Sequence, residues 1–141
     1  MDLDVEARRS GLLVQATPLI LLDTNAVIWL HRGDRRAAGL AGRATRLYAS
    51  PATILELQFL VEAGRLHLRT GASVRQLIHD DRWVVDDPAS AAWFEKASEI
   101  GFTHDPFDRL IVAHARLRHW RLATGDQVLL GQLTPAERIE V

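Results

Sequence analysis

Four acidic residues lie at positions where folding could bring their carboxylates together. Asp23 and Asp126 each follow an apolar run, Asp108 lies in the first turn of a predicted helix, and Glu56 lies on an apolar helical stripe. Carboxylates that converge without a basic partner repel one another, so such a group favours a bound divalent cation. The sequence has no cysteine and no paired-histidine motif, so oxygen ligands select Mg²⁺ or Mn²⁺ over zinc. A site of this kind suits metal-assisted phosphodiester hydrolysis.

A buried strand is predicted to position the first of these acids. The run Leu19–Leu22 is too short for a helix and too apolar for a half-exposed strand, which is typical of a parallel sheet covered on both faces. Ligands bind beyond the carboxyl ends of such strands, where Asp23 would lie. A simpler interpretation is that Asp23 only caps the helix expected over residues 26–30. Thr24 and Asn25, which follow it, are candidates for orienting ligands or water.

Glu56 is unusual because its neighbours on one face of the helix predicted over residues 52–63 are all apolar. These neighbours are Ala52, Phe59, Leu60 and Ala63, whereas Gln58 and Glu62 share the opposite, polar face. A buried carboxylate is costly, so Glu56 needs a cation, a hydrogen-bond network or an opening to solvent. We therefore interpret Glu56 as a functional residue.

The stretch THDPFDR supplies two further acids with different predicted roles. Asp105 as N-cap, Pro106 at the first helical position and Asp108 at the third make a good helix start by capping rules alone. The helix that follows is apolar on most sides, so its start should meet the sheet edge that holds Asp23. An N-cap side chain turns back onto its own helix, so Asp108 is the better metal ligand and Asp105 an auxiliary residue. His114, on this helix, is expected to be a satisfied core histidine.

The remaining pattern predicts an α/β fold, with helices on both faces of a short, mainly parallel central sheet. Strands are expected at residues 47–50, 83–85, 120–123 and 139–141, and helices at 72–80, 89–100 and 128–130. Asp86 and Asp87 are expected to end a strand and cap the next helix. Thr124, Gly125 and Asp126 repeat the opening pattern of a strand followed by a turn that bears Thr and Asp.

Length and composition indicate one domain over residues 18–141, preceded by a flexible extension at 1–17. A chain of 141 residues with 48% hydrophobic and 25% charged residues is typical of a globular protein without a membrane span. The apolar stretch 11–22 is interrupted by polar residues and lacks a cleavage site, so we expect no signal peptide and a cytoplasmic location.

Arginine dominates the basic residues, since Lys96 is the single lysine among 17 lysines and arginines. Arginine is the better bidentate phosphate ligand, although codon composition would give the same bias. Arg32, Arg35 and Arg36 belong to the most basic segment, residues 31–46. That segment is either a solvated helix face or an RNA-binding rim beside the acidic site.

The order LLDTN, ILELQFL, DPFDRLIVAHA and LATGD resembles the PIN-domain endoribonucleases, and especially the VapC-like toxins of bacterial toxin-antitoxin modules. The resemblance runs from Leu19 to the C-terminus, and DPFDRLIVA is its most specific part. Carried over by position, the four family acids fall on Asp23, Glu56, Asp108 and Asp126. Thr124 matches the hydroxyl residue before the last acid, whereas Gly125 departs from the basic or polar residue often found there.

This resemblance implies a three-layer α/β/α PIN-like fold, Mg²⁺ or Mn²⁺ dependence, single-stranded or structured RNA as substrate, a homodimer and inhibition by a cognate antitoxin protein. Two alternatives stay open at this point. One is a PIN-like module that binds RNA or protein without cutting, against which the presence of all four acids argues. The other is a metal-dependent phosphatase, which the first strand disfavours because the DxDxT arrangement of an aspartyl nucleophile is missing after it.

Overall fold

The computed structural model describes residues 19–41 and 46–141, which contain a five-stranded sheet with the strand order β3-β2-β1-β4-β5. Every neighbouring pair is parallel, so the expected mainly parallel sheet is confirmed. The proposed extension at 1–17 and residues 42–45 of the basic segment lie outside the described residues. The strands are β1 (Leu19–Leu22), β2 (Arg46–Ala49), β3 (Val84–Val85), β4 (Arg121–Thr124) and β5 (Arg138–Glu140).

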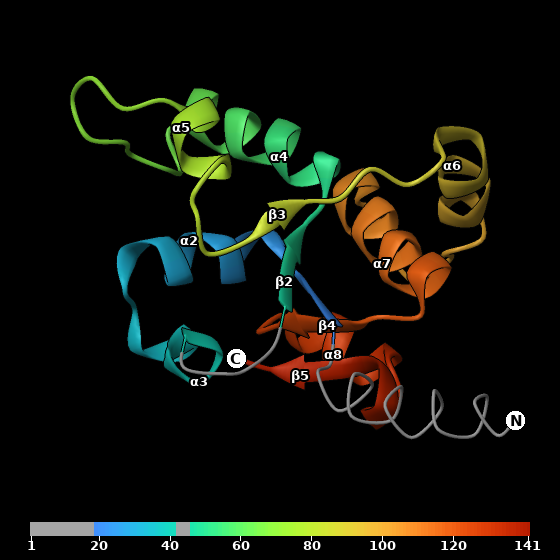
Figure 1. The fold of residues 1–141 in the computed structure, drawn as a ribbon. Coiled ribbons are helices and arrows are strands. Elements are labelled where there is room, and N and C mark those ends of the chain that lie inside the picture. Colours follow the sequence, from blue (N-terminus) through green and yellow to red (C-terminus); the bar gives the residue numbers. More distant parts are fainter. Residues whose placement is uncertain (1–18, 42–45) are drawn as a thin grey trace, which may run out of the picture.

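Helices cover both faces of this sheet, which confirms the three-layer α/β/α architecture (Figure 1). They are α2 (Thr24–Arg32), α3 (Ala38–Ala41), α4 (Pro51–Glu62), α5 (Val74–Ile78), α6 (Ser90–Ser98), α7 (Pro106–Arg118) and α8 (Gln127–Gln132), with 3₁₀ turns at Arg35–Ala37 and Pro135–Glu137. None of the helices in the described ranges has the length and apolar character needed to cross a membrane.

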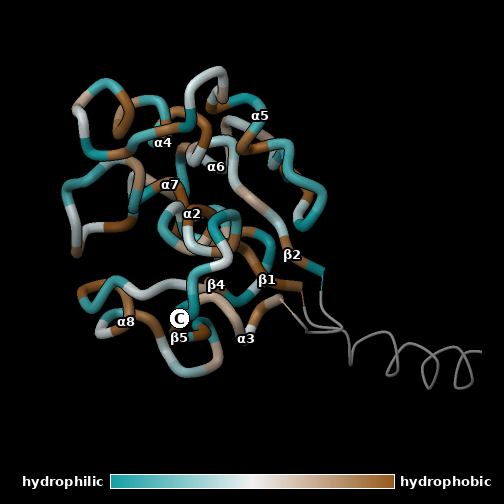
Figure 2. The backbone as a smooth tube through the Cα atoms, turned by 90° about the vertical axis from the view of Figure 1, so that its left-hand side faces the viewer, coloured by the Kyte–Doolittle hydropathy of each residue, from teal (hydrophilic) through white to brown (hydrophobic). Residues whose placement is uncertain are grey.

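The central strand β1 sends alternate side chains into two separate cores. Ile20 and Leu22 pack with the buried residues of α2, α4 and α5, whereas Leu21 packs with those of α6, α7 and α8. All three side chains have no exposed surface. The brown colour of β1 in Figure 2 reflects this continuous apolar run. A strand buried on both faces explains why the sequence shows no polar alternation here.

Strand register brings the ends of β1, β2 and β4 to one edge of the sheet. Leu22 pairs with Ala49 of β2 and with Ala123 of β4. The Asp23 amide then donates to the Ala123 carbonyl at 2.9 Å. Asp23 and Thr124, the first residue after β1 and the last of β4, therefore lie side by side.

The expected caps at Asp23 and Asp105 are confirmed, and Asp86 follows the end of β3 as expected, but the assignment of Asp86 and Asp87 as helix caps is wrong. The residue that precedes α6 is Ala89, which makes no side-chain capping bond. Asp86 instead accepts a hydrogen bond from Arg118 Nε at 2.8 Å and contacts His114 Nε2 at 2.7 Å. His114 is fully buried, so its expected place in the core is confirmed, but only its Nε2 is satisfied, because Nδ1 has no hydrogen-bond partner among the described residues. Asp86 thus pairs with two residues of α7, which is distant in sequence, and local capping rules cannot detect such a partner.

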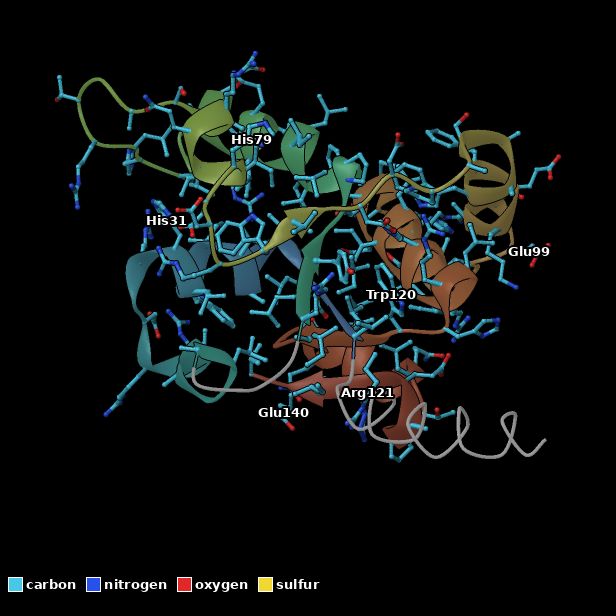
Figure 3. The ribbon with its side chains drawn as sticks, viewed as in Figure 1. His31, His79, Glu99, Trp120, Arg121 and Glu140 are labelled. Carbon is cyan, nitrogen blue, oxygen red and sulfur yellow. The ribbon has the colours of Figure 1, made fainter. Side chains whose placement is uncertain are left out.

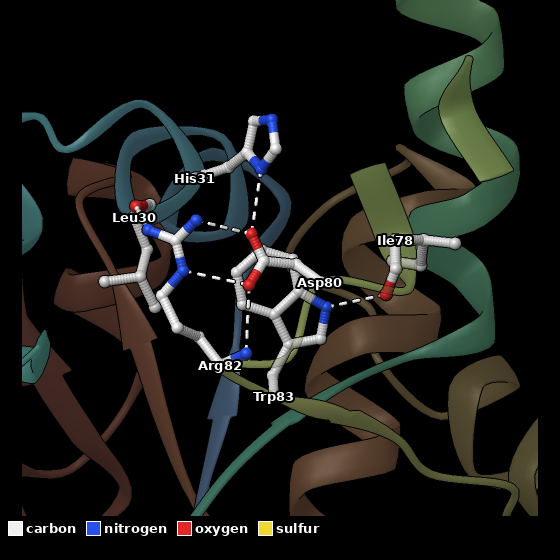
Figure 4. A network of polar contacts seen from close by, with 6 residues as sticks. All are labelled: Leu30, His31, Ile78, Asp80, Arg82 and Trp83. Atoms are coloured by element: carbon white, nitrogen blue, oxygen red, sulfur yellow. Dashed lines mark hydrogen bonds and ion pairs between the residues drawn. The ribbon is translucent and has the colours of Figure 1, made fainter. Parts of the chain in front are cut away.

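Asp80 fastens the loop before β3 to the end of α2 (Figure 4). Its carboxylate pairs with Arg82 at 2.6 Å and with His31 at 2.9 Å. Arg82 also donates to the Leu30 carbonyl at 2.8 Å, which accepts the amide of the C-cap residue Gly33 at 3.2 Å as well. At the other side of the sheet, Arg121 donates to the Arg138 carbonyl at 2.9 Å and so joins β4 to β5 (Figure 3).

Gly125 occupies a position where no side chain fits. A Cβ added there would lie 2.8 Å and 2.9 Å from two ring carbons of Trp29, and 2.9 Å from the Val141 carbonyl oxygen. Trp29 is itself fixed, because it packs on the core and the guanidinium of Arg36 lies 4.1 Å above its ring. The turn between Thr124 and Asp126 therefore requires glycine for space.

We expect Gly125→Ala to destabilise the fold by about 1–3 kcal/mol, because the added methyl group must displace a rigid indole ring or the backbone. Gly131→Ala is the matched control, since no heavy atom lies within 4 Å of a Cβ placed there and alanine favours the helix. Urea unfolding of both variants measures the difference. Equal stability of the two variants would show that the contact with Trp29 is not restrictive.

Candidate active site

A cavity of about 420 Å³ lies at the carboxyl edge of the sheet. All four acids carried over from the sequence line it, and they come from four separate parts of the chain. We call it the acidic cavity, and its lining residues are Asp23, Thr24, Asn25, Glu56, Phe59, Leu60, Arg65, Asp105, Pro106, Phe107, Asp108 and Asp126. The predicted convergence of acids is therefore present in the fold.

Asp23 is the most deeply buried acid of the cavity, with 6% of its surface exposed. One carboxylate oxygen accepts a hydrogen bond from the Thr24 amide at 2.8 Å, and the other accepts one from Thr124 Oγ1 at 2.7 Å. Asp23 is thus both the N-cap of α2 and a lining residue, so the two interpretations from the sequence are compatible. Burial raises the pKa of its carboxyl, although these two hydrogen bonds favour the charged form.

Glu56 is joined to α2 by a short chain of hydroxyl groups. Thr24 Oγ1 donates to Glu56 Oε1 at 2.5 Å, and Thr53 Oγ1 lies 3.1 Å from the same Thr24 oxygen. Because Thr24 has one hydroxyl proton and gives it to Glu56, Thr53 must be the donor to Thr24. This network answers the requirement that a partly buried carboxylate find hydrogen-bond partners.

The apolar stripe around Glu56 faces the cavity more than the core. Ala52 is buried, but 48% of the Phe59 surface is exposed and Ala63 is exposed. Leu57, with no exposed surface, is the residue of α4 that fills the core. The expectation of a core-facing stripe is therefore only partly correct, because helical spacing identifies a shared face without telling whether that face meets the core or a cavity.

Asp105 takes the capping role expected of it, while Asp108 lines the cavity as a candidate metal ligand. Asp105 Oδ1 accepts hydrogen bonds from the amides of Phe107 at 2.8 Å and Asp108 at 3.2 Å, so it is the N-cap of α7. The Asp108 carboxylate makes no hydrogen bond or ion pair within the described part of the chain. Rotation of this side chain would therefore break no hydrogen bond among the described residues.

Asp126 and Thr124 are coupled at the end of β4. The Asp126 amide donates to Thr124 Oγ1 at 3.0 Å, while that hydroxyl donates to Asp23. Asp126 Oδ1 also accepts from the amides of Val128 and Leu129 and caps α8. Thr124 has no exposed surface, so it acts on the cavity only through the two acids. Asn25, by contrast, is exposed at the cavity wall.

Burial and mutual repulsion make Asp108 and Glu56, like Asp23, resist ionisation. Burial is the main reason that the pKa of Asp108 rises to about 7, and the charges of Asp105, Asp23, Asp126 and Glu56 add to it. Burial likewise raises the pKa of Glu56 to about 7, although the hydrogen bond from Thr24 opposes the change. A cluster with such pKa values close to neutrality is typical of functional sites.

The chemistry of these donors fits a hard divalent cation. The acids offer only oxygen atoms, and among the described residues that line the cavity only Arg65 is basic. As they stand, however, no three acidic or histidine side chains in residues 19–41 and 46–141 are close enough to share one ion. Several of the carboxylates are engaged with hydroxyl groups and helix amides instead. Binding a cation would require side-chain rotation, which Asp108 can undergo without losing a hydrogen bond in the described part of the chain.

The predicted rim arginines do not line the acidic cavity. Arg32 lines a different cavity with His31 and His67, and Figure 3 places His31 at the end of α2. Arg36 pairs with Asp34 at 2.8 Å. The arginine beside the acids is Arg65, which follows α4 directly after Gly64 and carries no sequence signal of a role at the cavity.

Thr53 and the two phenylalanines of the cavity were also missed as site residues. Thr53 lies three residues before Glu56 and so shares its helical face, which was a readable signal. Phe59 and Phe107 are neighbours of Glu56 and Asp108 in the sequence, but large apolar residues are usually assigned to the core. Only the three-dimensional arrangement shows them at a cavity.

The PIN domain family model matches residues 20–130 of the sequence. The chain therefore belongs to the PIN domain family. This match covers all four acids, the three threonines Thr24, Thr53 and Thr124, and the first four strands except Leu19. No curated protein sequence matches the chain significantly.

Solved structures with the same fold are distant in sequence. VapBC2 from Rickettsia felis, bound to a DNA fragment from their promoter, includes a chain 17% identical to this one, with a TM-score of 0.62 over 86% of this chain and 98% of that chain. A toxin-antitoxin complex from Klebsiella pneumoniae includes a chain 19% identical to this one, with a TM-score of 0.60 over 85% of this chain and 95% of that chain. PAE2754 from Pyrobaculum aerophilum is 23% identical, with a TM-score of 0.58 over 87% of this chain and 89% of that chain. At these identities the likeness shows the fold alone.

We expect Asp108→Asn to stabilise the metal-free chain increasingly as the pH rises. The ordinary pKa values are 3.8 for Asp108 and 4.5 for Glu56, against about 7 for both in the fold. Between pH 4 and 7 the folded state therefore binds more of these protons than the unfolded state, and their contribution to stability falls with pH. The variant should gain little at pH 4 and about 1–2 kcal/mol at pH 8, where solvent screens part of the repulsion.

Urea unfolding in chelator across this pH range measures the gain. Comparison with the parent at each pH is essential, because burial lowers the pKa of His114 and so favours the folded state as the pH rises. Glu56→Gln should show the same rise in stability relative to the parent as the pH increases. Glu62→Gln, on the exposed face of the same helix, is the control that should follow the parent. Profiles of all three variants parallel to the parent would contradict the proposed repulsion.

Proposed function

We propose that this protein is a divalent-metal-dependent endoribonuclease and the toxin of a toxin-antitoxin pair. The observation that carries the nuclease part is the acidic cavity, where four carboxylates from separate segments lie together beside one arginine. Membership of the PIN domain family supports the same conclusion. A stable structural role would not gather like charges at one sheet edge, because their repulsion and burial both disfavour the folded state.

Asp23, Glu56, Asp108 and Asp126 would hold the cation, which we propose to be Mg²⁺ or Mn²⁺. When bound, such a cation supplies positive charge that stabilises the developing charge on a phosphodiester and makes a water molecule a better nucleophile. Thr124 and Thr24 orient the carboxylates of Asp23 and Glu56 through the hydrogen bonds described above.

The toxin part of the proposal rests on resemblance and on the structural neighbours. The chain from Rickettsia felis belongs to VapBC2, and the structure from Klebsiella pneumoniae is described as a toxin-antitoxin complex. By analogy we propose a cognate antitoxin that occupies the acidic cavity, and a homodimer of this chain. A basic side chain of the antitoxin would find the carboxylates there as partners.

We expect Asp108→Asn to lower the rate of Mg²⁺-dependent RNA cleavage by about a hundredfold or more, because it removes a metal-binding charge. Asp105→Asn should keep most of the rate, since asparagine caps a helix nearly as well as aspartate. Purified parent and variants are incubated with mixed cellular RNA, with and without Mg²⁺. Circular dichroism confirms that both variants fold.

Two outcomes of this assay would contradict us in different ways. If Asp105→Asn lost RNA cleavage while Asp108→Asn kept it, the roles of the two acids would be reversed. RNA that is bound by the parent but never cut, with or without Mg²⁺, would identify a non-catalytic RNA-binding module instead.

We expect expression of the chain alone to arrest bacterial growth, and co-expression of a small protein encoded beside it to relieve the arrest. Glu56→Gln should abolish the arrest because it removes a charge from the metal site. Glu62→Gln, on the same helix but outside the cavity, should arrest growth like the parent. Colony counts after induction give the measurement, with immunoblots to match protein levels. If Glu56→Gln is as toxic as the parent, catalysis at this site is not the cause.

A further inference from the structure

Two phenylalanine rings form one wall of the acidic cavity. Phe59 of α4 and Phe107 of α7 have ring centroids 6.0 Å apart and planes inclined by 37°. Both line the cavity, and 48% of the Phe59 surface is exposed while Phe107 is half-buried. These rings pack on each other, but they leave aromatic surface open to solvent.

This aromatic wall is tied closely to the acids. Phe59 lies one helical turn after Glu56, and Phe107 directly precedes Asp108. Helices α4 and α7 are in contact, so the pair bridges the two elements that carry these acids. A group stacked on the rings would therefore lie next to the carboxylates that we propose to hold the metal.

Arg65 adds a positive charge to the same cavity. Gly64 turns the chain back after α4 with a φ of 71°, and the Arg65 amide then donates to the Leu60 carbonyl at 2.8 Å. The backbone of Arg65 is thus fixed beside the helix that bears Glu56 and Phe59. Within the described residues its guanidinium makes no ion pair, which leaves it available to a phosphate.

The aromatic wall is distinct from the other exposed apolar surface of α4. Ile54 and Leu55 line a separate cavity between α4 and α5, which has no acidic residue among its lining. Phe59 instead faces charged groups. A partner that bears both phosphate and flat aromatic groups therefore suits the aromatic wall and Arg65 better than an apolar protein segment does.

We infer that the wall formed by Phe59 and Phe107 is a nucleobase-stacking subsite, with Arg65 on an adjacent phosphate. This inference rests on the proposed function and assigns residues that would hold its RNA substrate. Stacking on an aromatic side chain needs an unstacked base, which single strands and loops offer and a duplex does not. Every base has an aromatic face, so the subsite tolerates many sequences.

Binding is tested with a short single-stranded RNA that carries 2-aminopurine, in the presence of Ca²⁺ as the oxygen-binding cation. We expect the parent to bind it about tenfold or more tightly than the same strand in a duplex, and to quench the 2-aminopurine fluorescence by stacking. Phe59→Leu and Phe107→Leu should each weaken binding by about tenfold and reduce the quenching. Phe59→Trp should keep both the affinity for the RNA and the fluorescence quenching of the parent. A gel confirms that the RNA stays intact.

Phe94→Leu is the matched control, because Phe94 is a phenylalanine of α6 with 55% of its surface exposed and lies outside the acidic cavity. It should bind RNA like the parent. Circular dichroism of every variant checks folding, and sedimentation measures its oligomeric state.

The outcomes separate the subsite from the nuclease proposal. If the parent binds and cleaves RNA while both leucine variants bind and quench unchanged, the subsite is wrong and the nuclease stands. Equal affinity for single strand and duplex also overturns the subsite. If the leucine variants change only the oligomeric state, the wall is a protein interface. A parent that neither binds nor cleaves RNA contradicts both proposals.

Discussion

The hydrogen bond from Thr124 Oγ1 to Asp23 joins the two strand ends on which the acidic cavity depends. A carboxylate as buried as Asp23 can stay charged only if donors replace water. The same hydroxyl accepts from the Asp126 amide, so one oxygen fixes the positions of two acids. This arrangement requires β1 and β4 to be parallel and in their observed register. A slip of one residue would turn Thr124 to the other face of the sheet.

The fold was largely readable from the sequence because its elements carry strong local signals. The apolar run of β1 predicted a strand covered on both faces, and the caps at Asp23 and Asp105 predicted the starts of α2 and α7. Where local rules failed, a distant partner had intervened. Asp86 was assigned to a helix cap by its position before Pro88, yet it serves His114 and Arg118, whose proximity only tertiary packing creates.

The acids of the site were also predictable, but their surroundings were less so. Carboxylates at strand ends and on apolar faces are conspicuous, because they conflict with the cost of burying charge. Arg65 and Phe59 involve no such conflict: an arginine in a turn and a phenylalanine on a helix are ordinary in sequence. Their role at the cavity arises from the turn at Gly64 and the packing of α4 on α7, which no local pattern encodes.

The contact between Gly125 and Trp29 carries an evolutionary consequence. Since a methyl group at position 125 already meets the indole ring, the two positions share one fixed volume. A lineage that acquires a longer side chain at 125, beside the last acid of the cavity, must accept a smaller residue at 29 and also a shift of the backbone at Val141, whose carbonyl oxygen meets the same Cβ. That change would also remove the ring on which Arg36 lies. The two positions are therefore expected to covary among homologues, with bulk present at one or the other and not at both.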